Sequence, residues 1–174
     1  DLLAERQVKV LHNPESNMKL ASGAAPIPAM LERGMTIGLG TDGCASNNNL
    51  DLFLEMDTVA KLHKVITLNP TVMDASTVLR MATIDGARAL GLDRVTGSLE
   101  PGKAADLIVI DTQKPHLTPM YNPVSHLIYA VRGSDVSASV INGQVVMENS
   151  HLVTLDEPQV MLDVNRIARR IRKR

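Results

Sequence analysis

The apolar positions in the first half of the chain fall into two strand-like runs, each followed by a polar loop and a helical pattern. Residues 7–11 form the first short strand, and residues 26–34 form a helix that starts with prolines and stops at a glycine. Residues 36–40 are a nearly continuous apolar run, typical of a strand covered on both faces. Residues 50–66 carry apolar side chains at helical spacing. This order predicts an α/β fold with two βα units of a parallel sheet.

The pattern changes from helical to β near residue 92. Residues 74–90 continue the helical spacing, in two pieces that break near Thr83. The turn EPGK then lies between two strand-like segments, VTGSL and ADLIVID. We therefore predict a domain boundary, with residues 1–92 forming the βα units and residues 93–174 forming a smaller β portion that ends in a helix.

Two further elements are predicted within this β portion. Residues 137–141 and 144–147 flank Asn142-Gly143, a dipeptide that strongly favours a two-residue hairpin turn. Residues 158–170 then repeat apolar side chains at helical spacing, which predicts a last helix.

Composition narrows the classes of partner. The apolar fraction is 44% and the charged fraction 21%, which are ordinary for a globular protein, and no stretch approaches the ~20 apolar residues of a membrane span. The net charge is −1 and aromatic residues make up 2%, so we expect no nucleic-acid partner and no membrane partner. The single cysteine, Cys44, excludes an internal disulfide and fits a reducing compartment, which predicts a cytoplasmic protein.

Polar side chains follow both predicted parallel strands. His12 and Asn17 lie in the first loop, and Asp42 comes directly after the second strand. Because the carboxyl ends of parallel strands meet at one edge of a sheet, we expect His12 and Asp42 on the same face. An ionised aspartate is a hard ligand for a divalent metal, and a histidine there is a candidate to contact substrate. The alternatives stay open: Asp42 as a helix cap or turn residue, and His12 as a structural residue.

The other candidate side chains have weaker arguments. Cys44 has no histidine beside it to activate a thiol, so we interpret it as a small residue that fills a tight loop. One cysteine cannot supply the zinc site of the cytidine-deaminase type. The remaining histidines lie on a helical apolar stripe or in the β portion, and we interpret them as structural: His63, His116, His126 and His151.

Four segments occur in the order seen in the amidohydrolase superfamily: HNPESNMKLASG, GLGTDGCASNNNLDLFLEM, MATIDGARALG and GSLEPGKAADLIVID. The chain most resembles the deaminases of 5-methylthioadenosine and S-adenosylhomocysteine. The resemblance implies a (β/α)8 barrel that holds zinc or another divalent ion, plus a small β-sandwich. This chain would supply the last two barrel units, residues 1–92, and part of the sandwich, residues 93–174.

The resemblance also implies roles for single residues. The aspartate of the GTDG segment binds the metal and hydrogen-bonds the attacking water in such enzymes, and both roles fall on Asp42. The HNPESN segment lines the same site, which makes His12 and Asn17 candidate substrate-binding residues. The implied reaction is hydrolytic deamination of an adenosine analogue with release of ammonia.

Much of the family's machinery is absent from these residues: an H-x-H pair, a further metal histidine, a proton-transferring glutamate and a histidine near the water. We therefore expect the small-molecule substrate to meet a site completed by an N-terminal barrel segment or its chain, with a second copy of this chain as another candidate partner. The alternatives are a guanine or other aminohydrolase, a chlorohydrolase, or a non-catalytic structural module.

Overall fold

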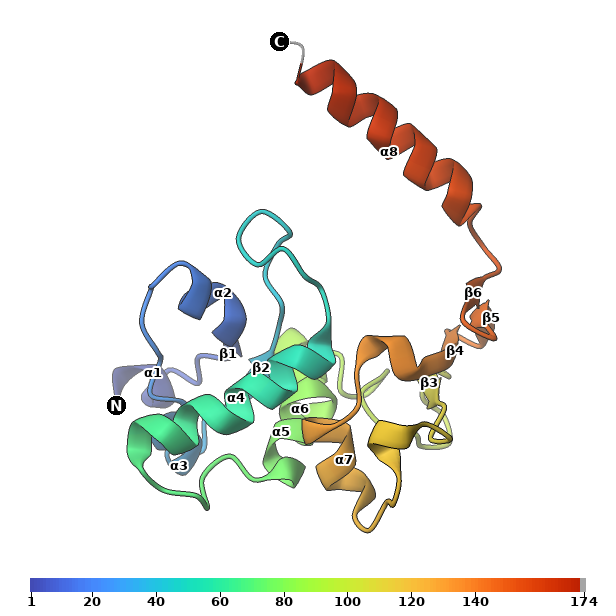
Figure 1. Cartoon of the computed structure of the whole chain (residues 1–174). Helices are drawn as coiled ribbons and strands as arrows, with labels where there is room; N and C mark the ends of the chain where they lie inside the picture. The colour runs from blue at the N-terminus through green and yellow to red at the C-terminus, as the bar shows by residue number, and fades with distance from the viewer. Residues whose placement is uncertain (173–174) are drawn as a thin grey trace.

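The computed structural model describes residues 1–172, and two short parallel strands organise its N-terminal half (Figure 1). β1 (Val10–His12) and β2 (Ile37–Leu39) pair in parallel, with His12 opposite Leu39. α1 (Leu2–Glu5) precedes β1, while α2 (Pro14–Lys19) and α3 (Ile27–Glu32) connect the two strands. β2 is buried along its whole length, as its apolar run predicts.

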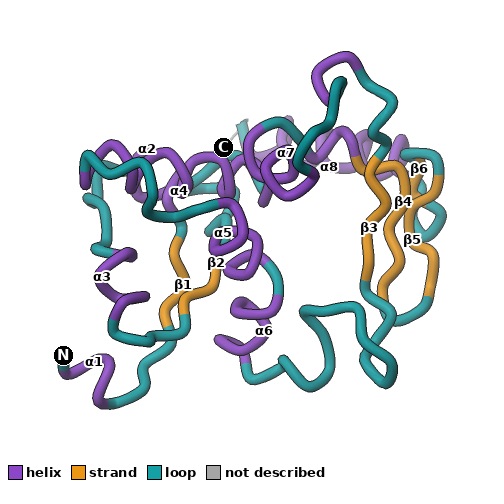
Figure 2. Tube along the Cα trace, turned by 90° about the horizontal axis from the view of Figure 1, so that it is seen from below, coloured by secondary structure: helices purple, strands orange, loops and turns teal. Residues whose placement is uncertain are grey.

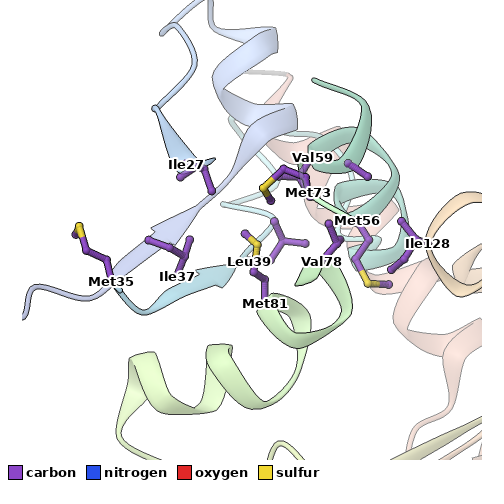
Figure 3. Close-up of a cluster of buried hydrophobic side chains, with 11 residues drawn as sticks. Ile27, Met35, Ile37, Leu39, Met56, Val59, Met73, Val78, Met81 and Ile128 are labelled. Carbon is purple, nitrogen blue, oxygen red and sulfur yellow. The ribbon is translucent and has the colours of Figure 1, made fainter. Parts of the chain in front are cut away.

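Four helices that follow β2 close the apolar core: α4 (Leu52–Thr67), α5 (Ala75–Ala82), α6 (Ile84–Leu90) and α7 (Pro123–Tyr129). The first three pack on β2, and α7 packs against α4 and α5. Figure 3 shows buried side chains from these elements meeting around β2, among them Ile37, Leu39, Met56, Val78, Met81 and Ile128. The carboxyl end of β2 is therefore held by a packed core, which gives the loop after it a rigid base.

The C-terminal half carries an antiparallel sheet in the order β3-β4-β5-β6, and Figure 2 shows this sheet on the opposite side of the molecule from β1 and β2. Its strands are β3 (Leu107–Ile110), β4 (Val136–Ile141), β5 (Gln144–Glu148) and β6 (His151–Leu152). Two short 3₁₀ turns, Pro115–Leu117 and Gly133–Asp135, lie between β3 and β4. α8 (Glu157–Ile171) extends away from the rest of the chain (Figure 1).

The mixed α/β fold class is confirmed, and the elements differ from prediction mainly in extent. The strands predicted at residues 7–11 and 36–40 are shorter in the structure. The first begins only at Val10, because the chain leaves α1 through a turn at Gln7. The second ends at Leu39, and the Gly40 amide makes the last hydrogen bond to the neighbouring strand, at 3.0 Å from the His12 carbonyl. The break near Thr83 and the hairpin at Asn142-Gly143 are confirmed.

The predicted VTGSL strand was wrong, because residues 93–98 form turns. Gly97 has a φ of +92°, and a Cβ built there would lie 2.7 Å from the Cβ of Ala87. This segment is therefore folded closely onto α6 instead of being extended in a sheet.

The predicted boundary at residue 92 stays a prediction, although α7 bears on it. α7 belongs to the C-terminal half of the sequence, yet its Ile128 is fully buried in the same core as Met56 and Val78. None of the helices within residues 1–172 is long and apolar enough to cross a membrane.

Candidate active site

Asp42 lies just beyond β2, in a loop whose donors converge on its carboxylate. Its Oδ2 atom accepts hydrogen bonds from the hydroxyls of Ser16 at 2.7 Å and Ser46 at 2.6 Å, and its Oδ1 atom accepts one from the Gly43 amide at 2.7 Å. The backbone of Asp42 has a φ of +59°, the left-handed region that few residues other than glycine adopt. The side chain itself is exposed.

These donors favour the ionised form of Asp42. Hydrogen bonds from Ser46, then Ser16, then the Gly43 amide hold the pKa of Asp42 below its usual value. The carboxylate is therefore ionised at neutral pH, as metal binding or proton acceptance requires. The helix-cap alternative is wrong, because α4 is capped by Asp51, whose carboxylate accepts from the amide of Phe53.

Ser16 connects the loop after β1 to the loop after β2, and the sequence argument did not single it out. It is 2% exposed and belongs to α2, whereas Asp42 follows β2. The parallel pairing brings the two loops together as expected, and the contact between them is this serine–aspartate hydrogen bond. Its signal in the sequence is a serine four residues after a strand-end histidine.

His12 is buried against α4. It is 2% exposed, and its Nε2 atom lies 3.2 Å from Nε2 of His63, so one ring donates a proton and the other accepts it. Burial first, and His63 second, lower the pKa of His12 to about 4, so both rings are neutral at pH 7. His63 packs inside the molecule and its partner is the candidate residue His12, so the purely structural role of His63 stays a prediction.

The positions of the other predicted residues, Asn17 and Cys44, do not assign them a role in the site. Asn17 is half-buried on α2, and its backbone amide donates to the backbone carbonyl of Asn13 at 3.1 Å. The substrate-binding roles of His12 and Asn17 stay predictions. Cys44 is exposed in a turn of the Asp42 loop, and the interpretation that it is a small residue filling this loop stays a prediction.

A second polar group that the sequence argument missed lies below the Asp42 loop. Glu55 of α4 is fully buried, and its Oε1 atom accepts from the side-chain amide of Asn47 at 2.6 Å. Its Oε2 atom accepts from the backbone amide of Glu15 at 3.2 Å. The same Asn47 amide donates to the carbonyl of Thr41 at 2.7 Å. Burial raises the pKa of Glu55, partly offset by the donors that face it.

The described residues do not form a complete metal site. Within residues 1–172, no group of three or more His, Cys, Asp or Glu side chains could hold a metal ion. A catalytic zinc normally takes about three protein ligands, and Asp42 fits as one of them. Its Oδ1 atom has one donor and keeps acceptor capacity, whereas Oδ2 already has two.

Comparisons with known proteins agree on one family. Residues 1–146 match the model described as the amidohydrolase family. A 5-methylthioadenosine/S-adenosylhomocysteine deaminase from Syntrophobacter fumaroxidans is 63% identical over 99% of this chain and 39% of its own length. A 5′-deoxyadenosine deaminase from Methanosarcina mazei is 52% identical over 97% of this chain and 38% of its own length.

A solved structure has nearly the same backbone fold as this chain. An adenosine deaminase from Xanthomonas campestris with bound zinc superposes with a TM-score of 0.96, at 42% identity, over 99% of this chain and 39% of that one. The chain thus spans about two fifths of the length of these proteins.

Proposed function

Because the chain belongs to the amidohydrolase family, we propose that it is the C-terminal part of a hydrolase that removes the amino group of adenosine analogues and releases ammonia. The relatives from Syntrophobacter fumaroxidans and Methanosarcina mazei are named as deaminases of adenosines modified at the 5′ position, and the identity reaches 63% across nearly the whole chain. The observation that carries the proposal is the exposed, ionised carboxylate of Asp42, held by donors from two loops at the end of a buried strand.

The same proposal assigns the fold. β1 and β2 are the last two strands of a (β/α)8 barrel, residues 1–92, and residues 93–174 contribute a C-terminal portion of a small β-sandwich. An apolar hollow supports this assignment, because it is lined by leucines from both parts of the chain: Leu11, Leu39, Leu90, Leu92 and Leu99. Leu11 on β1 is 53% exposed, so the N-terminal barrel segment would cover it.

Asp42 has two roles in this proposal. A bound zinc ion supplies the site with a water of lowered pKa, from about 16 towards about 7. Asp42 Oδ1 accepts from the Gly43 amide alone and keeps acceptor capacity, so this oxygen would bind the zinc ion, and the carboxylate accepts a proton from water while Ser16 and Ser46 keep Oδ2 in place. The oxygen of water adds to the amino-bearing ring carbon, one of its protons ends on the neighbouring ring nitrogen, and the other passes through Asp42 to the amino group. The carbon–nitrogen bond then breaks, ammonia leaves, and the oxygen stays on the ring as a carbonyl.

The remaining proposals concern the other residues of the site, the compartment and the assembly of the protein. Asn17 is proposed to bind substrate from the first loop. His12 is proposed to act on the same substrate, which requires its buried ring to turn away from His63. The other metal ligands are proposed to come from the N-terminal segment. A reducing, cytoplasmic compartment and assembly with a second copy of the chain stay predictions.

The test is a substrate panel on the intact protein, meaning the polypeptide that contains this chain and its N-terminal segment. Ammonia release is measured with 5-methylthioadenosine, S-adenosylhomocysteine, 5′-deoxyadenosine, adenosine and guanine, and chloride release with a chlorotriazine. We expect the highest kcat/KM for an adenosine modified at the 5′ position. Turnover of guanine or of the chlorotriazine alone would contradict the proposal.

A further inference from the structure

We propose that Glu55 is a positioning residue that sets the place of Asp42 from two sides. The contacts that carry the proposal form the Glu55 bridge, which consists of Glu55, the side chain of Asn47 and the backbone amide of Glu15. The consequence for catalysis rests on the proposed function, whereas the consequence for the two loops does not.

The first side of the Glu55 bridge reaches the peptide before Asp42. Asn47 donates one amide hydrogen to Glu55 Oε1 at 2.6 Å and the other to the Thr41 carbonyl at 2.7 Å. That carbonyl belongs to the peptide linking Thr41 to Asp42, so holding it restrains the backbone that enters the φ of +59°. A non-glycine residue in this region costs about 1–3 kcal/mol, so the surrounding structure has to hold it there.

The second side reaches the hydroxyl that donates to Asp42. Glu55 Oε2 accepts from the Glu15 amide at 3.2 Å, and the next residue, Ser16, donates to Asp42 Oδ2 at 2.7 Å. The side chain of Glu15 adds to the same attachment, because it accepts from Asn49 at 2.8 Å and from Thr58 at 2.9 Å. Both loops are thereby attached to α4.

The chemistry of the bridge requires a carboxylate. The Glu15 amide can only donate, and Asn47 uses both hydrogens of its amide, so each oxygen of Glu55 faces a donor. A glutamine of the same size would turn its own NH₂ group towards one of those donors. Glu55 is fully buried, and no Lys, Arg or His within the described part of the chain forms an ion pair with it. Burying an unpaired charge is unfavourable, so packing alone does not explain this residue.

The experiment compares Glu55→Gln with the matched control Glu32→Gln in the intact protein. Glu32 is exposed at the end of α3. With 5-methylthioadenosine as substrate, we expect Glu55→Gln to lower kcat at least about tenfold while KM changes less than about threefold, because a misplaced Asp42 affects the chemical step more than binding. Glu32→Gln is expected to match the wild type.

Hydrogen–deuterium exchange supplies a readout that does not depend on activity. Glu55→Gln is expected to speed exchange in residues 14–17 and 41–48, with the core helices α5 and α7 unchanged. Faster exchange throughout the core would show a general structural role and overturn the proposal, as would a kcat within twofold of the wild type. Asn47→Ala removes only the side of the Glu55 bridge that reaches the Thr41–Asp42 peptide, and it replaces Glu55→Gln if that variant does not fold. It is expected to lower kcat in the same way and to speed exchange in residues 41–48, with residues 14–17 unchanged because the Glu15 amide still donates to Glu55.

The two proposals fail in different ways. If the wild-type protein releases ammonia from no substrate, the proposed function fails, and the exchange pattern alone decides the case of Glu55: local change in the two loops supports the Glu55 bridge, and unchanged exchange there overturns it.

Discussion

Asp42 receives hydrogen bonds from Ser16, Ser46 and the Gly43 amide, and these bonds favour its charged form. The serines therefore act on the residue that carries the proposed chemistry. They come from different loops, so the lowering of the Asp42 pKa depends on the two loops staying together.

Removing a donor should raise the pKa of Asp42. Ser46 makes the largest contribution to lowering it, so Ser46→Ala is expected to shift the pKa upwards, and Ser16→Ala to do so as well. The measurement is an NMR pH titration of the Asp42 carboxyl carbon. Ser22→Ala, an exposed serine just after α2, is the control and should leave the titration unchanged. A pKa that is the same in all variants would contradict this account of the loop.

The His12–His63 pair predicts acid sensitivity. His12 titrates at about 4 when folded and has a reference pKa of 6.5, so the unfolded chain binds more protons between these values. Stability is therefore complete above pH 6.5 and is lost as the pH falls towards 4. From this shift we expect the free energy of unfolding to be about 2 kcal/mol lower at pH 5 than at pH 7.

Urea unfolding at both pH values measures this loss. His12→Asn should reduce the difference between pH 5 and pH 7, whereas His151→Asn, at an exposed position, should keep it. An identical pH dependence in the wild type and His12→Asn would rule out the buried pair as its source.

The sequence predicted that Asp42 lies at the end of a buried strand, because this position follows from a local apolar pattern. It did not locate Ser16, Glu55 or the pairing of His12 with His63, since each depends on how α2 and α4 pack against the strands. Glu55 in particular lies on a helix where the pattern predicts only an amphipathic face.

At the scale of elements, the helices α3 to α6 and the buried strand could be predicted, whereas the short helices α2 and α7 could not. α2 and α7 each begin with a proline after an asparagine, and they are 6 and 7 residues long. Helices this short are not stable alone and give too few positions for a periodic pattern. They form here because Ser16 and Ile128 are held by contacts from distant parts of the chain.

The close packing of β2 on α6 should make Gly38 intolerant of a side chain. A Cβ at Gly38 would lie 2.8 Å from Leu11 Cδ2 and 3.1 Å from the Cα of Gly86. The leucine end can move, but the backbone at Gly86 cannot without separating α6 from β2. Gly38→Ala is expected to lower the free energy of unfolding by about 1–3 kcal/mol in urea titrations.

Gly43→Ala is the matched control for that change, because a Cβ there meets nothing within 4 Å. It should alter the free energy of unfolding by less than about 0.5 kcal/mol. Equal effects of the two substitutions would show that β2 and α6 are not tightly packed at Gly38.

At the scale of the whole molecule, the proposed function makes this chain one part of a metal site whose other ligands come from an N-terminal segment. The chain spans 39% of the Syntrophobacter fumaroxidans deaminase, and within residues 1–172 no group of three or more His, Cys, Asp or Glu side chains could hold a metal ion. Metal analysis after dialysis should find less than about 0.1 zinc per chain for these residues alone and about one for the intact protein. Stoichiometric zinc on the isolated chain would contradict this division.

The most direct test of the central claim is ammonia release from 5-methylthioadenosine by the intact protein carrying Asp42→Asn, with zinc content measured in parallel. Asp163→Asn, at an ion-paired position on α8, is the control. We expect Asp42→Asn to lower kcat at least about a hundredfold, because it removes the base that accepts the proton of water, and Asp163→Asn to match the wild type. An Asp42→Asn protein that releases ammonia at the wild-type rate would contradict the account.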